Sequence, residues 1–288
     1  MTVLEGIQKS TEFLAKKEVE SPRLQAELLL AHVLKLPRMK LYLNFERALT
    51  EPETNTFREL VKRRAQREPL QHIVGTTSFC GFEIAVNRHV LVPRPETELL
   101  AEAGWTFLST LNPKPSTALD FGTGSGCIAI ALAAKCPTAH IVALDVSKDA
   151  LDVASANAER NKVADQIEFA HGNSVEVLTT RSTNRHFDLI ISNPPYIPTA
   201  EIATLDPEVR DYDPRGALDG GTDGLDFYRR FAAEMRPFLK PGGKIMLEFG
   251  DGQGEVIRDI FTAQNWIVEA IREDYTQRQR ILIAKPLA

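Results

Sequence analysis

The sequence predicts an α/β fold in which a mostly parallel sheet is covered by helices on both faces and follows a small helical segment. Two observations support this prediction. From about residue 115 onward, apolar runs of strand length alternate with segments of helical periodicity, an alternation typical of parallel sheets. Residues 1–75 instead carry helix-capping patterns and helical spacing of apolar residues.

The N-terminal segment is expected to form helices. Ser21 and Pro22 match a cap followed by a first-turn proline, and Thr50 with Glu53 forms a capping-box pattern. In residues 1–75, Lys and Arg outnumber Asp and Glu by 13 to 10. A run of cations on the second helix is either a solvated surface or a docking face for a partner. That run consists of Lys62, Arg63, Arg64 and Arg67.

The strands and helices after the first segment follow from their apolar patterns. A β-hairpin is expected over 76–95, where turn formers interrupt β-branched and aromatic residues, and a helix begins near Glu96. The last two strands are joined too closely for a helical crossover, so we expect them to pair antiparallel. The expected strands are 117–121, 140–145, 166–172, 187–192, 244–250, 266–271 and 280–285, and the expected helices are 127–135, 148–161 and 225–239.

Composition and charge exclude several classes of protein. The net charge of -5 gives no general attraction to nucleic acid or to an anionic membrane, and no apolar run reaches membrane-spanning length. The three cysteines lack CxxC spacing and the N-terminus lacks a signal-peptide pattern, so we expect a cytoplasmic location. The histidines show no HExxH spacing, so no metal site is expected.

A glycine-rich turn follows the first strand of the predicted sheet. Gly122, Gly124 and Gly126 allow the backbone to turn sharply and to approach a ligand closely. The helix that follows offers free N–H groups to an anionic group. The spacing is G-x-G-x-G, which differs from the G-x-G-x-x-G of dinucleotide sites. The turn is therefore a weak indication of a nucleotide-like ligand when taken alone.

An acidic residue ends the next strand. Asp145 lies about twenty residues after the glycines, where a carboxylate can accept hydrogen bonds from the hydroxyls of a bound ribose. Asp145 could instead cap the helix that begins near Lys148. The glycine turn and the acid together favour a nucleoside site. NAD and S-adenosylmethionine both remain possible ligands at this point.

The tetrapeptide after strand 187–192 separates these ligands. Asn193 offers a side-chain oxygen and Pro194 a backbone carbonyl, which proline holds in a fixed direction. Tyr196 offers a flat ring against a planar amide or base. Two such acceptors can hold the N–H groups of an amide or amine nitrogen for methyl transfer, whereas hydride transfer gives no reason for them. The pattern therefore predicts S-adenosylmethionine as the cofactor and nitrogen as the target.

With these motifs in place, the sequence resembles the class I S-adenosylmethionine-dependent methyltransferases, and within them the protein-glutamine N5-methyltransferases of the PrmC/HemK family. The resemblance covers nearly the whole chain. It rests on "SPRLQAELLLAHVL", "VLVPRPETELL", "LDFGTGSGCIAIALA", "SNPPYIP" and "EDYTQRQRILIAKP". It implies a Rossmann-like sheet with the last strand antiparallel, a helical substrate-recognition domain over 1–75, a β-hairpin linker over 76–95 and a cofactor-binding catalytic domain over 96–288.

The resemblance also implies roles for individual residues. The glutamine substrate would lie in the Gly-Gly-Gln loop of class 1 peptide chain release factors. Asn193 would also lie near the cofactor. The residues after strand 166–172 would touch adenine, although relatives often have an acid and a larger side chain there. The implied cofactor contacts are Gly122, Thr123, Gly124, Ser125, Gly126, Asp145, Asn173 and Ser174, and the implied substrate contacts are Asn193, Pro194, Pro195 and Tyr196.

Other functions compete with glutamine methylation. "NPPY" is shared with DNA adenine-N6 methyltransferases, but the acidic catalytic segment and the lack of a second large recognition domain argue against direct nucleic-acid binding. A ribosomal protein is an alternative glutamine substrate. A non-enzymatic regulator that binds the cofactor is a further alternative, but it would not need "NPPY". A nicotinamide dehydrogenase is another, but the G-x-G-x-G spacing differs from that expected for dinucleotide binding. The long loop 197–224 is expected to act as a lid on the substrate side.

Overall fold

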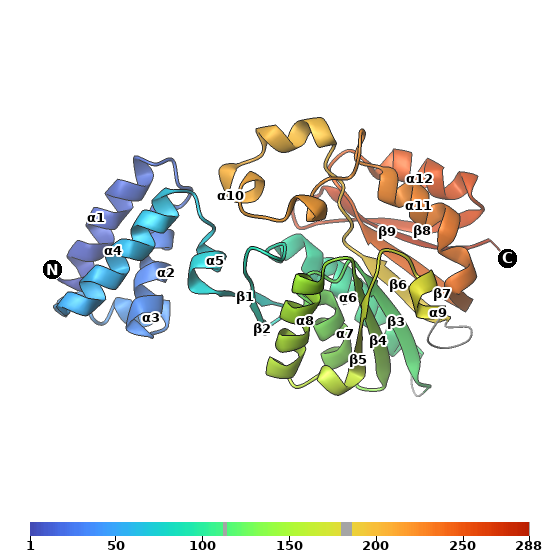
Figure 1. The fold of residues 1–288 in the computed structure, drawn as a ribbon, viewed down its shortest axis with the longest axis horizontal. Coiled ribbons are helices and arrows are strands. Elements are labelled where there is room, and N and C mark those ends of the chain that lie inside the picture. Colours follow the sequence, from blue (N-terminus) through green and yellow to red (C-terminus); the bar gives the residue numbers. More distant parts are fainter. Residues whose placement is uncertain (112–113, 180–185, 288) are drawn as a thin grey trace. The chain divides into compact units, whose positions relative to one another are not determined.

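The chain forms two compact units, and we describe each by itself. The computed structural model describes residues 1–111, 114–179 and 186–287. The helical unit comprises Met1–Thr76 and Asp206–Tyr212, and the larger unit comprises Thr77–Leu205 and Asp213–Ala288 (Figure 1). Residues 206–212 therefore pack with the N-terminal helices although they lie more than 100 residues further along the chain. The sequence analysis does not predict this excursion.

The helical unit is built around buried apolar side chains. The predicted capping box is confirmed, because the Thr50 side chain accepts a hydrogen bond from the Glu53 amide and the Glu53 carboxylate accepts one from the Thr50 amide. Ser21 precedes its helix with a φ of 47°, and its side chain forms no capping hydrogen bond. The helices are α1 (Val3–Ala15), α2 (Pro22–Leu34), α3 (Arg38–Leu41), α4 (Glu51–Ala65), α5 (Leu70–Val74) and α10 (Pro207–Arg210).

The cations on α4 have carboxylate partners within the same unit. Arg64 is buried and Arg67 is half-buried, and both donate to one oxygen of Glu208 in segment 206–212, at 2.7 and 2.6 Å. Lys62 and Arg63 pair with glutamates of α4 and of the turn after it. Burial raises the pKa of Glu208, but the hydrogen bonds from the two arginines outweigh burial and lower it. Half of this predicted basic face thus holds segment 206–212 in place.

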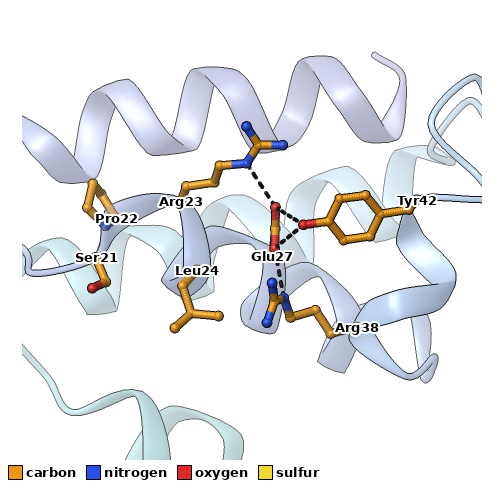
Figure 2. Close-up of a pocket in the computed structure, with 7 residues that line it drawn as sticks. All are labelled: Ser21, Pro22, Arg23, Leu24, Glu27, Arg38 and Tyr42. Carbon is orange, nitrogen blue, oxygen red and sulfur yellow. Dashed lines mark hydrogen bonds and ion pairs between the residues drawn. The ribbon is translucent and has the colours of Figure 1, made fainter.

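A buried carboxylate, that of Glu27, ties α2 to α3. Figure 2 shows Arg23, Arg38 and Tyr42 converging on Glu27, with hydrogen bonds of 3.0, 2.8 and 3.0 Å. Burial raises the pKa of Glu27, and these hydrogen bonds more than offset that effect and lower it. The cluster lines a pocket of about 340 Å³ that is formed by residues of the helical unit alone. Because a buried charge without partners is costly, each of the three donors stabilises this corner of the unit.

The larger unit contains the predicted sheet. Its strand order is β5-β4-β3-β6-β7-β9-β8. Strands β3 to β7 pair in parallel, whereas β9 is antiparallel to both β7 and β8, so the predicted fold class is confirmed. The last strand of the chain lies inside the sheet, between β7 and β8. The strands are β3 (Ser116–Phe121), β4 (Ala139–Asp145), β5 (Ile167–His171), β6 (Phe187–Ser192), β7 (Leu239–Glu248), β8 (Trp266–Glu273) and β9 (Gln279–Pro286).

Helices cover both faces of this sheet. A two-stranded hairpin, β1 (Thr76–Phe79) with β2 (Phe82–Ala85), forms a separate small sheet. The expected helix over 225–239 ends earlier than predicted, because Pro237 cannot continue it, and residues 236–238 form a 3-10 turn before β7. The remaining helices are α6 (Pro95–Ser109), α7 (Cys127–Lys135), α8 (Lys148–Arg160), α9 (Glu176–Thr179), α11 (Asp226–Glu234) and α12 (Gly254–Ala263).

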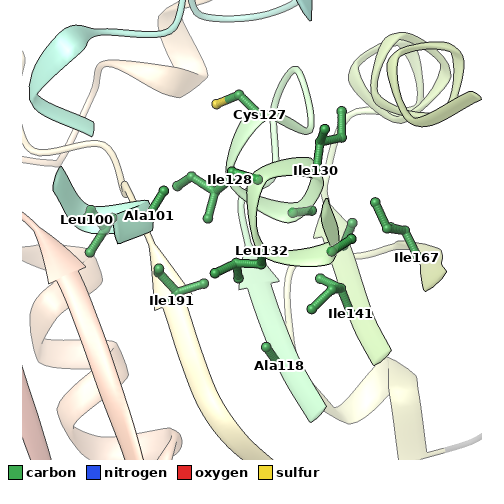
Figure 3. Close-up of a cluster of buried hydrophobic side chains, with 14 of the residues drawn as sticks. Leu100, Ala101, Ala118, Cys127, Ile128, Ile130, Leu132, Ile141, Ile167 and Ile191 are labelled. Atoms are coloured by element: carbon green, nitrogen blue, oxygen red, sulfur yellow. The ribbon is translucent and has the colours of Figure 1, made fainter. Parts of the chain in front are cut away.

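Each face of the sheet buries its own apolar cluster. On one face, Ile191 of β6 packs with Leu100 of α6 and Leu132 of α7 (Figure 3). On the other face, Ile190 packs with side chains of α11 and α12 such as Phe231. Successive strand residues alternate between the two clusters, as a buried strand of a parallel sheet requires. This double burial fixes the register of β6, and with it the position of the polar residues that follow.

Candidate active site

Three of the predicted functional segments lie at the same edge of the sheet. Strand β3 pairs with β4 on one side and with β6 on the other, and Asp120 lies opposite Ile191. The Oγ of Ser192 donates to the carbonyl of Phe121 at 2.6 Å, which fastens the end of β6 to the end of β3. In open α/β sheets, ligands bind beyond the carboxyl ends of the strands where the strand order reverses. The β3–β6 pair is that position here.

The glycine loop after β3 leaves its backbone open. Gly122 and Gly124 have φ values of 72° and 53°, and a Cβ added to either would meet no atom within 4 Å. Gly126 differs, because its Cβ would lie 3.0 Å from Cβ of Ala154 on α8. It is also the N-cap of α7 and provides no side-chain cap. The first two glycines therefore leave room for a ligand, while the third allows close packing of the helices.

Asp145 holds the glycine loop and does not cap α8. Its Oδ2 accepts a hydrogen bond from the amide of Gly124 at 2.9 Å, and its Oδ1 accepts one from the amide of Ser147 at 2.8 Å. Ser147 is the cap residue, since its side chain accepts from the amide of Ala150. The alternative role of Asp145 as a helix cap is therefore wrong. Two carboxylate oxygens have about four lone-pair sites, so the group can still accept hydrogen bonds from a ligand.

A fully buried carboxyl, which the sequence analysis did not single out, lies beneath the loop. Asp120 has no exposed surface, and its Oδ2 accepts hydrogen bonds from Thr123 Oγ1 at 2.6 Å and from the amide of Ala129 at 3.1 Å. Its Oδ1 has no hydrogen-bond partner in the part of the chain that the structure describes. Burial raises the pKa of Asp120 to about 7, against the effect of those two hydrogen bonds. In the sequence, the position of Asp120 inside the apolar run "TALDF" could have indicated this buried carboxyl group.

The two residues expected near adenine form a turn after β5. The amide of Gly172 donates to the carbonyl of Asp145 at 2.9 Å, so this turn lies beside the end of β4. The Ser174 hydroxyl accepts from the amide of Glu176 and also contacts its carboxylate, both at 3.2 Å. Ser174 is thus engaged within the turn. The adenine contact of Asn173 and Ser174 stays a prediction.

Asn193 is held in one orientation. Its Nδ2 donates to Thr97 Oγ1 on α6 at 3.1 Å, and Thr97 is 3% exposed. Because the oxygen and the nitrogen of a carboxamide leave their shared carbon in different directions, Oδ1 of Asn193 points away from Thr97 when Nδ2 donates to it. An oxygen at the end of a buried strand is therefore available as an acceptor for a ligand.

Tyr196 is supported by the loop that follows it. Gln253 Nε2 donates to the Tyr196 carbonyl at 3.0 Å. A Cβ on Gly220 would lie 2.8 Å from Cα of Tyr196, and a Cβ on Gly224 would lie 2.3 Å from its carbonyl oxygen. Burial raises the pKa of Tyr196 to about 12. The far end of loop 197–224 thus packs tightly against Tyr196 and supports it, while the role of the loop as a substrate-side lid stays a prediction.

Two family models match this chain, one in each of its two parts. The PrmC N-terminal domain model matches residues 5–75, and the Methyltransferase small domain model matches residues 100–205. The release factor glutamine methyltransferase of Geobacter sulfurreducens is 46% identical over 87% of this chain and 84% of its own length. That of Chlorobaculum tepidum is 43% identical over 97% of this chain and 95% of its own length.

The chain belongs to the release factor glutamine methyltransferase family.

Solved structures show the breadth of the fold that this family shares. The hMettl16 catalytic domain in complex with MAT2A 3'UTR hairpin 1 matches with a TM-score of 0.54 and 18% identity, over 90% of this chain and 91% of its own. A methyltransferase from Pyrococcus furiosus matches with a TM-score of 0.50 and 21% identity, over 78% of this chain and 98% of its own. At these identities the likeness concerns the fold alone.

The "PRPETE" segment of this family member reaches the site through several contacts. Arg94 pairs with Asp213 at 2.7 Å, which fastens the segment to the middle of loop 197–224. Glu98 accepts a hydrogen bond from the amide of Cys80 at 2.7 Å and so holds the hairpin. Thr97, between them, is the partner of Asn193. The segment therefore connects the hairpin, Asn193 and loop 197–224. The sequence alone did not explain this role.

The side chain of Asn157 is expected to stabilise the glycine loop and the hairpin. Its buried carboxamide bonds the amide and carbonyl of Ala85 at 2.8 and 2.9 Å and the carbonyl of Ser125 at 2.9 Å. We expect Asn157→Leu to leave these backbone groups without a partner and to lower the free energy of unfolding by about 3 kcal/mol, measured by denaturant titration. The exposed Asp152→Asn on the same helix is the control. A change below about 0.5 kcal/mol for Asn157→Leu would contradict the role.

Proposed function

We propose that this protein transfers a methyl group from S-adenosylmethionine to the side-chain nitrogen of a glutamine in the Gly-Gly-Gln motif of class 1 release factors. The single observation that carries the proposal is the fixed carboxamide of Asn193, whose oxygen is turned away from Thr97 at the strand end next to the glycine loop. Membership of the family supports the choice of glutamine and of the protein substrate. Because such substrates are translation factors, we also propose a cytoplasmic location.

The residues at the strand ends fit the cofactor. Gly122 to Gly126 would lie along its methionine part, and Asp145 would accept hydrogen bonds from its ribose. Asn173 and Ser174 would border its adenine. The buried Asp120 suits a ligand that carries positive charge, because a nearby cation favours the ionised carboxylate. When bound, S-adenosylmethionine supplies an electrophilic methyl group on a positively charged sulfur.

The chain's own contribution is to hold the glutamine nitrogen. An amide nitrogen is a poor nucleophile because its lone pair is delocalised into the carbonyl. Asn193 Oδ1 and the carbonyl of Pro194 would each accept one N–H of the glutamine, which fixes the direction of its lone pair. Pro195 restricts the backbone, and Tyr196 offers its ring to the planar amide. Such orientation of two reactants can supply about 7–11 kcal/mol of a barrier.

The substrate test compares three acceptors. Native protein is incubated with methyl-labelled S-adenosylmethionine and, separately, a class 1 release factor, a ribosomal protein fraction and duplex DNA. A release factor with its Gly-Gly-Gln glutamine replaced by glutamate is the matched control. We expect label on the native release factor and none on its variant. Label on DNA instead, or equal label on both release factors, would contradict the proposal.

Two substitutions should separate substrate handling from cofactor binding. Asn193→Ala removes the acceptor for the glutamine, so kcat should fall at least about 100-fold while the cofactor dissociation constant changes little. Asp145→Ala should instead weaken cofactor binding by about 1.5–3 kcal/mol for each charge-assisted hydrogen bond lost. Single-turnover kinetics and calorimetry measure the two effects. Normal turnover by Asn193→Ala would show that its assigned role is wrong.

Asp120 predicts a pH dependence of cofactor affinity. Its raised pKa of about 7 means that the free protein holds a proton there below pH 7, and a bound cation favours losing it. Affinity should therefore rise with pH up to about pH 7, by at most about tenfold per unit. Asp120→Asn should remove this dependence, and the difference between the two proteins cancels the cofactor's own titration. Identical pH profiles in calorimetry would contradict the prediction.

A further inference from the structure

A buried glutamate lies next to Asn193 at the end of the neighbouring strand. Strands β6 and β7 are parallel, and Ser192 lies opposite Leu247. The residues that follow this pair are Asn193, directly after the end of β6, and Glu248, the last residue of β7. Glu248 is 3% exposed, and its Oε2 has no hydrogen-bond partner among the described residues. The function proposed above assigns no role to this carboxyl group.

Asn193 is hydrogen-bonded to Thr97, and the carboxyl group of Glu248 lies beside this pair. Thr97 Oγ1 accepts from Asn193 Nδ2, so its own hydrogen is free to donate. The side chains of Thr97 and Asn193 both lower the pKa of the Glu248 carboxyl group, as donors that lie beside it do. An ionised carboxylate is only an acceptor, and so it can face the NH2 of Asn193 but not its oxygen. An ionised Glu248 therefore favours one orientation of the Asn193 carboxamide, with Nδ2 on the side of Thr97 and Glu248.

The surroundings of Glu248 make its charge sensitive to pH. Burial, together with the negative charge of Glu96, raises the pKa of Glu248 to about 7 against the opposing effects of Thr97, Arg280 and Asn193. The titratable groups that face it are Glu96 of α6, Arg280 of β9, Tyr196 and Tyr228; the Tyr228 hydroxyl donates to the backbone carbonyl of Glu248 at 2.8 Å. Arg280 is itself held by Asp274 at 3.1 Å.

We propose that Glu248 and Thr97 are positioning residues that keep the Nδ2 of Asn193 inward and its Oδ1 toward the glutamine substrate. This inference rests on the proposed function for the identity of the substrate, but the orientation of Asn193 is a property of the free protein. When Glu248 gains a proton, it becomes able to donate to the Asn193 oxygen. The reversed carboxamide would then present N–H groups to a substrate that also presents N–H groups. Protonation of Glu248 therefore inactivates the site.

The orientation can be measured without any reaction. In the free protein, the side-chain NH2 resonances of Asn193 are followed by NMR with 15N-asparagine labelling and are assigned by their loss in Asn193→Ala. They should shift with a midpoint near pH 7 in the native protein and in Asp120→Asn. In Glu248→Gln they should not shift, because that side chain does not titrate. Resonances that stay constant in the native protein, or titrate equally in Glu248→Gln, would overturn the proposal.

Kinetics test whether the orientation matters for transfer. Thr97→Val removes the hydroxyl at nearly constant volume, and Thr97→Ser restores it. We expect kcat to fall about 100-fold in Thr97→Val and to return to near the native value in Thr97→Ser, with the cofactor dissociation constant and thermal midpoint nearly unchanged. In native protein kcat should fall as pH drops below 7. Equal kcat values in Thr97→Val and the native protein would overturn the positioning role.

The two proposals fail in different ways. If native protein methylates no glutamine while Asn193 titrates with Glu248 as described, the proposed function fails and the orientation stands. If native protein methylates the release factor while Thr97→Val and Glu248→Gln retain native kcat and pH profiles, the inference fails and the proposed function stands.

Discussion

The candidate site depends on the register of the parallel strands β3, β4, β6 and β7. Each is buried by apolar side chains, and a shift by one residue would turn every side chain to the wrong face. With the register fixed, the residues that follow must meet at one edge. This brings the loop of Gly124, the carboxylate of Asp145 and the amide of Asn193 together although they lie far apart in the chain. The bond from Ser192 to Phe121 reinforces the same alignment.

Two buried carboxyl groups at this edge come at a cost to stability. The pKa values of Asp120 and Glu248 are both raised to about 7 by burial. A carboxyl whose pKa is higher in the folded than in the unfolded state stabilises the fold at low pH, and that contribution is lost as pH rises toward 7. Near neutral pH, ionisation of these two buried groups therefore lowers the free energy of unfolding. Their positions, one beneath the glycine loop and one beside Asn193, suggest that chemistry rather than stability accounts for them.

Much of the fold follows from sequence because its signals are local. The apolar runs of β3, β4 and β6 and the capping box of α4 have their own patterns, and the strand-end rule then places Asp145 and Asn193 at one edge. The pairing of Glu208 with Arg64 and Arg67 was not predictable, because it joins segments that no local pattern connects. For the same reason the positive charge on α4 could not be recognised as already neutralised.

The supports of the site were also hidden in the sequence. Thr97 and Glu248 lie 96 and 55 residues from Asn193 in the chain, and neither belongs to a motif whose chemistry is evident from composition. Gly220 and Gly224 predict a turn, but their close approach to the backbone of Tyr196 depends on the path of the loop in three dimensions. Sequence patterns thus predicted the groups that we propose contact ligands, whereas the residues that orient those groups were found only from three-dimensional contacts.

The most direct test of the central claim is a crystal structure with S-adenosylhomocysteine and a Gly-Gly-Gln peptide. It would show which atoms hold the glutamine nitrogen. The account predicts that Asn193 Oδ1 and the carbonyl of Pro194 each lie about 2.9 Å from that nitrogen, with Nδ2 of Asn193 still on Thr97. A glutamine nitrogen held by other atoms, or an Asn193 carboxamide that presents its NH2 to the peptide, would contradict it.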